Sequence, residues 1–484
     1  MTKKRHQQID VLIEKVGYPN RARGVELIPV QTDEVDAFLE IYQTKRDMPR
    51  GRAIVAKGGI PGQIYRATTG RTRGEAKEVT LCELLERSPL EKASACSASE
   101  RCGGCCYQTL SYEAELMMKG QQIQELFRQA GFTNLRVPIQ RSPLVQGYRN
   151  KMEYTFGDAE KDGPLVLGLH RPRHFYEIVE TPDCNIVPPD FTILRAFIQD
   201  FCREKGLTYY HRRERQGYLR HLVVRASLTR QELMLNLVTT SQEGLHPSDI
   251  RELLRRLDQL PLTYTLTSVY HTINDSPADA VIAEKVELWS GRAYLIEELM
   301  GLTFHVGPFS FFQPNVFGAE NLYRKAVELA GDLTGKTVYD LYSGTGTITQ
   351  IMAKRAQRAV GVEIVEEAVE KARESAERNE IVNAKFIAND VLKELDALAA
   401  SEEHPEVIVL DPPREGLHPK ALPKICAAKA DRIIYISCNP TTLVRDLVEM
   451  EKLGYRVTEA RAYDQFSRTR HVETVVLMSR VEGK

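Results

Sequence analysis

Apolar and polar residues follow three different patterns along the chain. In residues 1–88, short apolar runs, such as 53–56 and 63–67, are separated by glycine and proline. Short strands with this punctuation are typical of a small β-barrel. A charged segment at residues 33–46, with the pattern of a helix, interrupts the strands. We therefore predict a small N-terminal domain of the β-barrel type over residues 1–88, with an insertion at 33–46.

The second pattern, over residues 89–300, mixes the periodicity of helices with that of strands. A cysteine-rich loop leads into a helical pattern at residues 112–130, and strand-like alternation follows, for example at 151–156 and 221–225. The mixture predicts a central α+β domain over residues 89–300.

From residue 301 to the C-terminus, strand and helix patterns alternate regularly. Runs with the composition of buried strands lie at residues 337–341, 359–363, 407–410 and 432–437. Residues 365–379 have the pattern of an amphipathic helix. The alternation predicts an α/β domain over residues 301–484 with a doubly wound parallel sheet. Such sheets bind ligands at the carboxyl ends of their strands, so the residues that follow each strand are the first candidates for function.

The composition excludes several classes of protein. Of the 484 residues, 42% are hydrophobic and 27% are charged, as in folded proteins rather than disordered chains. No run approaches the roughly 20 apolar residues of a membrane-spanning helix, and the basic start lacks the apolar core of a signal peptide. We therefore expect a cytoplasmic protein without a membrane partner. In that compartment the nine cysteines are expected to serve metal binding or catalysis.

The charge is balanced overall but unevenly distributed. The formal net charge is −1, so bulk attraction to a polyanion is excluded. Residues 203–225, however, contain seven basic and two acidic residues, interleaved with three tyrosines. This pattern suits phosphate contacts and base stacking with RNA, although a solvated surface has the same composition.

A glycine-containing loop follows the first strand of the last domain, with the sequence Asp-Leu-Tyr-Ser-Gly-Thr-Gly at residues 340–346. Seventeen residues after Gly346, Glu363 ends the next strand, where a carboxylate can accept hydrogen bonds from a ribose diol. The pair predicts a nucleoside cofactor, either NAD or S-adenosylmethionine; a structural tight turn is the alternative. Thr349 replaces the third glycine of a dinucleotide fingerprint, which favours S-adenosylmethionine and disfavours a dehydrogenase.

Candidate catalytic groups follow two later strands. Asp411 begins an Asp-Pro-Pro-Arg loop, and Cys438 lies in Ser-Cys-Asn-Pro after the strand at 432–437. A thiolate is a strong nucleophile near neutral pH. Glu473 begins the last apolar strand, where a charge is costly unless it is paired or functional, so we interpret it as a general base. The alternative for Cys438 is a buried structural cysteine, and the alternative for Glu473 is a solvated strand edge.

These motifs, with Phe-Phe-Gln-Pro-Asn at 311–315 and His-Val-Glu at 471–473, resemble in order those of the RNA uridine-5-methyltransferases. The resemblance runs from residue 58 to the C-terminus and is most specific from residue 309 onward. It implies that residues 301–484 form a Rossmann-like class I methyltransferase domain. It also implies methyl transfer from S-adenosylmethionine to C5 of a uridine in RNA. A cytosine-5-methyltransferase would require an acid in a different motif.

The resemblance also implies roles for individual residues. The cysteine that matches Cys438 attacks C6 of uracil, and the glutamate that matches Glu473 removes the C5 proton. Because C5 of uracil is a poor nucleophile by itself, a thiolate that adds at C6 divides one hard step into easier ones. The implied residues of the S-adenosylmethionine pocket are Gln313, Tyr342, Thr347, Glu363, Asp390 and Asp411.

Four cysteines are candidate metal ligands: Cys96, Cys102, Cys105 and Cys184. Their spacing is compatible with zinc or with an iron–sulfur cluster. Residues 102–108 resemble the iron–sulfur loop of the ribosomal-RNA branch of the family, which implies a structural [4Fe–4S] cluster rather than zinc. The same branch implies 23S ribosomal RNA as the substrate. The alternatives are a uridine in tRNA and a non-catalytic RNA-binding paralogue.

Two further stretches resemble RNA-binding parts of the family. Residues 57–62 are similar to the later strands of a TRAM-type barrel, from which the insertion at 33–46 departs. Residues 148–151, with the sequence Tyr-Arg-Asn-Lys, resemble a stretch that meets RNA. The resemblance therefore implies a degenerate TRAM-like domain, an RNA-binding central domain and a monomeric enzyme.

Overall fold

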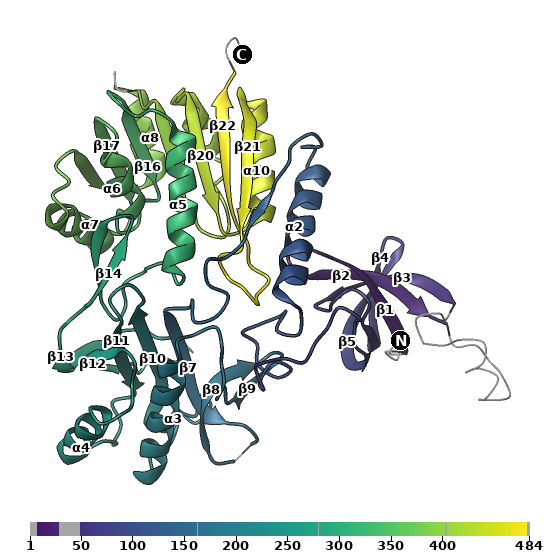
Figure 1. The fold of residues 1–484 in the computed structure, drawn as a ribbon, viewed down its shortest axis with the longest axis vertical. Helices are drawn as coiled ribbons and strands as arrows, with labels where there is room; N and C mark the ends of the chain where they lie inside the picture. The colour runs from purple at the N-terminus through teal and green to yellow at the C-terminus, as the bar shows by residue number, and fades with distance from the viewer. Residues whose placement is uncertain (1–6, 29–48, 162, 279, 402–403, 482–484) are drawn as a thin grey trace. The chain divides into compact units, whose positions relative to one another are not determined.

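The computed structural model describes residues 7–28, 49–161, 163–278, 280–401 and 404–481. The predicted insertion at residues 33–46 lies outside these ranges. The chain forms two compact units, one of Met1–Ser94 with Cys106–Ile139 and one of Ala95–Cys105 with Gln140–Lys484 (Figure 1). Among the helices within the described ranges, none is long and apolar enough to cross a membrane.

The first unit contains a closed five-stranded barrel with the strand order β1-β2-β3-β5-β4. The strands are β1 (Gln8–Gly17), β2 (Arg21–Leu27), β3 (Arg50–Lys57), β4 (Ile64–Arg73) and β5 (Ala76–Glu86). Alternate apolar residues such as Ile9, Val11 and Ile13 fill the interior. Gly24 is required where β1 and β2 approach, because a Cβ there would lie 1.9 Å from the carbonyl oxygen of Leu12. The predicted small barrel is confirmed.

Helix α2 (Tyr112–Gln129) belongs to the same unit, and the short strand β6 (Ile139–Gln140) lies where the chain leaves it.

The second unit begins with a mixed seven-stranded sheet in the order β13-β12-β11-β10-β7-β8-β9. Its strands are β7 (Lys151–Asp158), β8 (Leu165–Arg171), β9 (His174–Val179), β10 (Leu219–Ser227), β11 (Glu232–Thr239), β12 (Thr265–Ile273) and β13 (Lys285–Gly291). Two helices, α3 (Pro189–Glu204) and α4 (Pro247–Leu257), accompany it, and a hairpin of β14 (Leu295–Leu299) and β15 (Leu302–Val306) follows. Every residue of β10 is buried, as expected for the middle of a covered sheet.

The C-terminal sheet has the order β18-β17-β16-β19-β20-β22-β21-β6. Besides the short β6, its strands are β16 (Thr337–Leu341), β17 (Arg358–Glu363), β18 (Ala384–Ala388), β19 (Val407–Leu410), β20 (Arg432–Ser437), β21 (Tyr455–Tyr463) and β22 (Glu473–Arg480). The first five are parallel, whereas β22 is antiparallel to both β20 and β21. The predicted α/β class with a doubly wound sheet is confirmed; the domain boundaries at residues 88 and 300 remain predictions.

Helices cover the C-terminal sheet (Figure 1). They are α5 (Val316–Ala330), α6 (Thr347–Ala353), α7 (Glu366–Arg378), α8 (Val391–Ala399), α9 (Ala421–Ala427) and α10 (Pro440–Lys452). Helix α5 packs on β20 and β22, and α10 packs on β20 and β21. A continuous apolar core joins this sheet to the seven-stranded sheet, from Phe191 and Leu222 to Val409 and Ile434. This core holds the carboxyl ends of the parallel strands in a fixed position.

Candidate active site

Strand register brings three candidate residues to one edge of the C-terminal sheet. Leu341 of β16 pairs with Leu410 of β19, and Leu410 pairs with Tyr435 of β20. Because these strands are parallel, the residues that follow them, Tyr342, Asp411 and Cys438, emerge at the same edge.

Glu473 reaches this edge from the opposite direction. Strand β22 runs antiparallel to β20, and Ser437 pairs with Thr474. One further step along the same register places Cys438 opposite Glu473. The Glu473 side chain is buried, whereas Cys438 is half-buried. The structure therefore brings the two predicted catalytic residues together.

The electrostatics of this edge are dominated by buried negative charge. Burial, reinforced by Asp411, raises the pKa of Glu473 to about 8. Burial alone raises the pKa of Asp411 to about 7. Burial, followed by the charges of Glu473 and Asp411, raises the pKa of Cys438 to about 11. Burial therefore disfavours the charged forms of the thiol and of both carboxyl groups.

Arg414 supplies positive charge at this edge, and the sequence analysis assigned it no role. Its side chain hydrogen-bonds to Cys438, and both this bond and its charge lower the pKa of the thiol. The same charge lowers the pKa of Glu473. The only sequence signal was its place in the Asp-Pro-Pro-Arg loop.

Hydrogen bonds hold the loop that carries Arg414. The Asn439 side-chain amide donates to the carbonyl of Arg414 at 2.8 Å. The buried carboxylate of Asp446 in α10 accepts from the Leu417 amide at 2.8 Å and from the Tyr435 hydroxyl at 2.7 Å. Helix α10 thus positions the guanidinium through the loop backbone.

The glycine-containing loop adopts the tight geometry that its sequence predicts. Tyr342 and Gly346 both have positive φ angles, of 69° and 74°. A Cβ at Gly346 would lie 2.5 Å from the ring of Phe386, so only glycine fits there. Glu363 accepts hydrogen bonds from the backbone amides of Gly344 and Val365, both at 3.0 Å. Its carboxylate is therefore held beside the loop, in the position suited to a ribose diol.

Thr349, at the position of the missing third glycine, has a structural role. Its hydroxyl donates to the buried carboxylate of Asp340 at 2.6 Å. Gly361 provides the space for this contact, because a Cβ at that position would lie 2.6 Å from the Thr349 hydroxyl. Burial, together with the charge of nearby Asp411, raises the pKa of Asp340 to about 7. The edge therefore contains a third buried carboxyl group.

The remaining predicted cofactor residues surround the same edge. The Gln313 side chain donates to the Tyr323 hydroxyl at 3.1 Å. Burial, and then the charge of Asp411, raises the pKa of Tyr323, which places this pair near Asp411. Asp390 caps α8 by accepting from the Leu392 amide at 2.8 Å. Its charge also contributes, after burial, to raising the pKa of Tyr342 to about 12. Thr347 is the first residue of α6, directly after Gly346.

Three of the four predicted metal ligands lie close together. Burial, together with the charges of Cys96 and Cys102, raises the pKa of Cys184 to about 11. The sulfur of Cys102 accepts a hydrogen bond from the Gly104 amide at 3.3 Å, and that of Cys184 accepts from Ile186 and Val187. Cys105 lies on the same loop as Cys102, against the core of the unit.

Amide donors to sulfur suit cluster thiolates, so the donor set fits an iron–sulfur cluster chemically. Among the residues that the structure describes, however, no group of three or more His, Cys, Asp or Glu side chains is arranged to hold a metal ion. The metal assignment remains a prediction.

The basic run at residues 203–225 separates into buried and exposed parts. Arg220 and Arg225 are buried and donate to backbone carbonyls, and Tyr218 is also buried. The interpretation of these three residues as RNA contacts is wrong, because their polar groups are engaged inside the protein.

The exposed part lies against the β8–β9 turn and the beginning of β9. The Arg213 guanidinium lies 5.4 Å from the centre of the Tyr176 ring, which is 68% exposed. We call the exposed residues of these two segments the basic surface: Arg173, Tyr176, Arg212, Arg213 and Arg215.

Comparison with known proteins identifies close relatives. A family model described as tRNA (uracil-5-)-methyltransferase matches residues 298–481. An uncharacterized RNA methyltransferase of Caldanaerobacter subterraneus is 45% identical over 89% of this chain and 94% of its own length. One of Clostridium tetani is 41% identical over 89% and 93%.

A solved structure has the same fold. The tRNA (uracil-54, C5)-methyltransferase of Pyrococcus abyssi, in complex with S-adenosyl-L-homocysteine, superimposes with a TM-score of 0.71. The alignment covers 97% of this chain and 100% of the other at 24% identity. At this identity the likeness concerns the fold.

The electrostatics of the edge predict opposite effects of two substitutions on the Cys438 thiol. Arg414→Gln removes a group that lowers the thiol pKa, so the pKa should rise above about 11. Glu473→Gln removes a neighbouring negative charge, so the pKa should fall below about 11. The measurement is the pH dependence of alkylation at Cys438, followed by mass spectrometry of its peptide without cofactor. Alkylation of exposed Cys82 in the same samples is the internal control. Shifts in the same direction would contradict this account.

Proposed function

Because the chain belongs to the RNA (uracil-5-)-methyltransferase family, we propose that it methylates a uridine of 23S ribosomal RNA through a covalent bond between Cys438 and C6. The chain is an S-adenosylmethionine-dependent RNA methyltransferase. The observation that supports the covalent mechanism best is the register of β20 and β22, which pairs Ser437 with Thr474, the neighbours of Cys438 and Glu473. The Arg414 side chain hydrogen-bonds to Cys438.

Each step of the reaction uses a group at this edge. The Cys438 thiolate bonds to C6, and the electron pair of the C5=C6 double bond moves onto the C4 oxygen as an enolate. The C4 carbonyl then re-forms as C5 bonds to the methyl group of S-adenosylmethionine, and the S–CH3 bond breaks so that S-adenosylhomocysteine leaves as a neutral thioether. The sulfonium needs only correct placement against C5. Glu473 then takes the C5 proton, the double bond forms again, and Cys438 leaves as a thiolate.

The charged residues have complementary roles in this scheme. Arg414 favours the thiolate of Cys438 by its charge and hydrogen bond. Glu473, whose pKa is raised to about 8, can both accept a proton and release it near neutral pH. Asp411 and Asp340 are suited to a cationic ligand, because a nearby cation relieves the cost of ionising them. We assign the methyl-donor pocket to Gln313, Tyr342, Thr347, Glu363, Asp390 and Asp411.

Two features bear on which RNA is methylated. The cysteine-rich loop resembles that of the ribosomal-RNA branch, which supports 23S ribosomal RNA. The description of the matching family model names tRNA, so a uridine in tRNA is the second candidate. The closed barrel of the first unit is proposed to be a TRAM-type RNA-binding domain.

Release of tritium from RNA labelled at uridine C5 tests the activity and its substrate together. Unmodified 23S ribosomal RNA should release tritium only with S-adenosylmethionine, and tRNA should release far less. Cys438→Ala should abolish release because no adduct forms. Glu473→Gln should slow release about 100- to 10,000-fold and accumulate a denaturation-resistant, methyl-labelled adduct with RNA. Tritium release from tRNA alone would show that tRNA, and not 23S ribosomal RNA, is the substrate. Normal turnover by Cys438→Ala would exclude the covalent mechanism.

We propose that the basic surface contacts RNA phosphates, with Tyr176 available for base stacking. The double variant Arg212→Ala/Arg213→Ala should weaken RNA binding at low salt. It should also reduce the slope of log affinity against log salt by about 1 to 2, since each lost phosphate contact contributes about 0.7 to 0.9. The matched control, Arg251→Ala/Arg255→Ala, removes two exposed arginines of α4. An unchanged slope in the first variant would exclude this surface from the interface.

We propose that Cys96, Cys102, Cys105 and Cys184 bind a [4Fe–4S] cluster. Protein purified without oxygen should contain about 4 iron and 4 sulfide per chain. Cys184→Ser should lose most of both, whereas Cys202→Ser, at a buried cysteine of α3, should retain them. One zinc without sulfide would identify the alternative, and the absence of both metals would overturn the assignment.

A further inference from the structure

The segment 148–150, which leads into β7, is buried between two loops of the active site. Tyr148 is 0% exposed and Asn150 is 6% exposed, so neither side chain offers a surface to RNA. We call residues 307–315, between β15 and α5, the donor loop, because they include Gln313. We call residues 464–472, between β21 and β22, the base loop, because they lead into Glu473.

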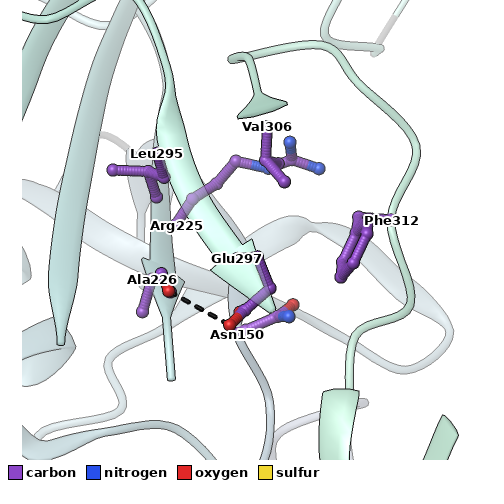
Figure 2. A pocket seen from close by; sticks show the side chains of 8 residues that line it. Asn150, Arg225, Ala226, Leu295, Glu297, Val306 and Phe312 are labelled. Atoms are coloured by element: carbon purple, nitrogen blue, oxygen red, sulfur yellow. Dashed lines mark hydrogen bonds between the residues drawn. The ribbon is translucent and has the colours of Figure 1, made fainter. Parts of the chain in front are cut away.

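Asn150 binds the donor loop at its end nearest α5. Its side-chain amide donates to the carbonyl of Gln313 at 3.0 Å. Its backbone amide donates to the carbonyl of Pro314 at 2.8 Å. Its own carbonyl accepts from the Ala226 amide at 2.8 Å, which connects it to β10 (Figure 2). Asn150 therefore ties the backbone of Gln313 to the rigid seven-stranded sheet.

Arg225 binds the beginning of the same loop. Its guanidinium donates to the carbonyls of Gly307 and Ser310, both at 2.5 Å. Asn150, Arg225 and Phe312 line one small pocket (Figure 2). Its volume of about 10 Å³ is that of roughly one water probe, too small for a substrate. These contacts therefore serve the position of the loop rather than the binding of a ligand.

Tyr148, two residues earlier, binds the base loop. Its hydroxyl donates to the carbonyl of Ser467 at 2.8 Å. The two loops also bind each other, because the Asn315 side chain donates to the Gln465 carbonyl at 2.9 Å. The Gln465 side chain donates back to the Asn315 carbonyl at 3.0 Å. One short buried segment thus contacts both loops, and the loops contact each other.

We propose that Tyr148 and Asn150 are positioning residues that act on different steps, Asn150 on the methyl donor through Gln313 and Tyr148 on proton removal through Glu473. The inference rests on the proposed roles of Gln313 and Glu473. Small displacements of reacting groups greatly lower the reaction rate. One rigid segment that contacts both loops therefore fixes the positions of Gln313 and Glu473 relative to each other. Each side chain can be shortened without removing its backbone contacts.

Tyr148→Phe removes the hydroxyl that holds the base loop. We expect the rate of C5 tritium release to fall about threefold to tenfold, the effect of one lost hydrogen bond. The methyl-labelled adduct should accumulate, while the Kd for S-adenosylmethionine stays unchanged. The matched control is Tyr455→Phe, since Tyr455 is also buried and donates to a carbonyl, that of Ala430, at 2.7 Å.

Asn150→Ala should have the complementary effect. We expect the Kd for S-adenosylmethionine to rise about threefold to tenfold, with no increase in the fraction of RNA trapped as adduct. The matched control is Asn383→Ala, whose side-chain amide donates to the carbonyls of Ala353 and Ala356.

The pattern across the variants decides the outcome. The inference is supported if Tyr148→Phe increases only the trapped adduct and Asn150→Ala raises only the Kd for S-adenosylmethionine. Neither change should occur in the control variants. Equal changes in both quantities, or none, would overturn it. Glu473→Gln serves as the reference: if it accumulates no adduct, the proposed mechanism itself fails. If it accumulates adduct and Tyr148→Phe does not, only the positioning role fails.

Discussion

The electrostatics of the active-site edge are set by several acidic groups that lie close together and are shielded from solvent. The carboxyl groups of Asp340, Asp411 and Glu473 and the thiol of Cys438 all have raised pKa values, with burial as the largest cause. Arg414 offsets only part of this charge. The edge is therefore suited to a cationic ligand, because a cation lowers the pKa of every acid around it.

This arrangement has a consequence for the nucleophile. The raised pKa of the Cys438 thiol disfavours the thiolate, which is the nucleophilic form. In the proposed mechanism, a cationic methyl donor beside these carboxyl groups would lower the pKa of the thiol. The register of β20 and β22 brings Glu473 near the thiol, where a negative charge on Glu473 raises the thiol pKa.

The rest of the second unit holds this edge in place. Helix α10 anchors the loop of Arg414 through Asn439 and Asp446. The seven-stranded sheet anchors the donor loop through Asn150 and Arg225. Arg225 lies in a basic run whose composition suggested contact with RNA. Because its side chain is buried, it belongs instead to the scaffold of the protein. Within the described part of the run at residues 203–225, Arg212, Arg213 and Arg215 are exposed.

The sequence by itself determined the local elements and the residues of the edge. Apolar periodicity and strand-end position identified the parallel sheet, Cys438 and Glu473, because strand ends in such folds are predictable from order along the chain. The contacts of Arg414, Tyr148 and Asn150, and the division of the basic run into buried and exposed residues, are visible only in the tertiary structure. Their functions depend on which loop packs against which strand and on the resulting loss of solvent. Contacts between residues more than 150 positions apart, such as Tyr148 with Ser467, leave no periodic signal in the sequence.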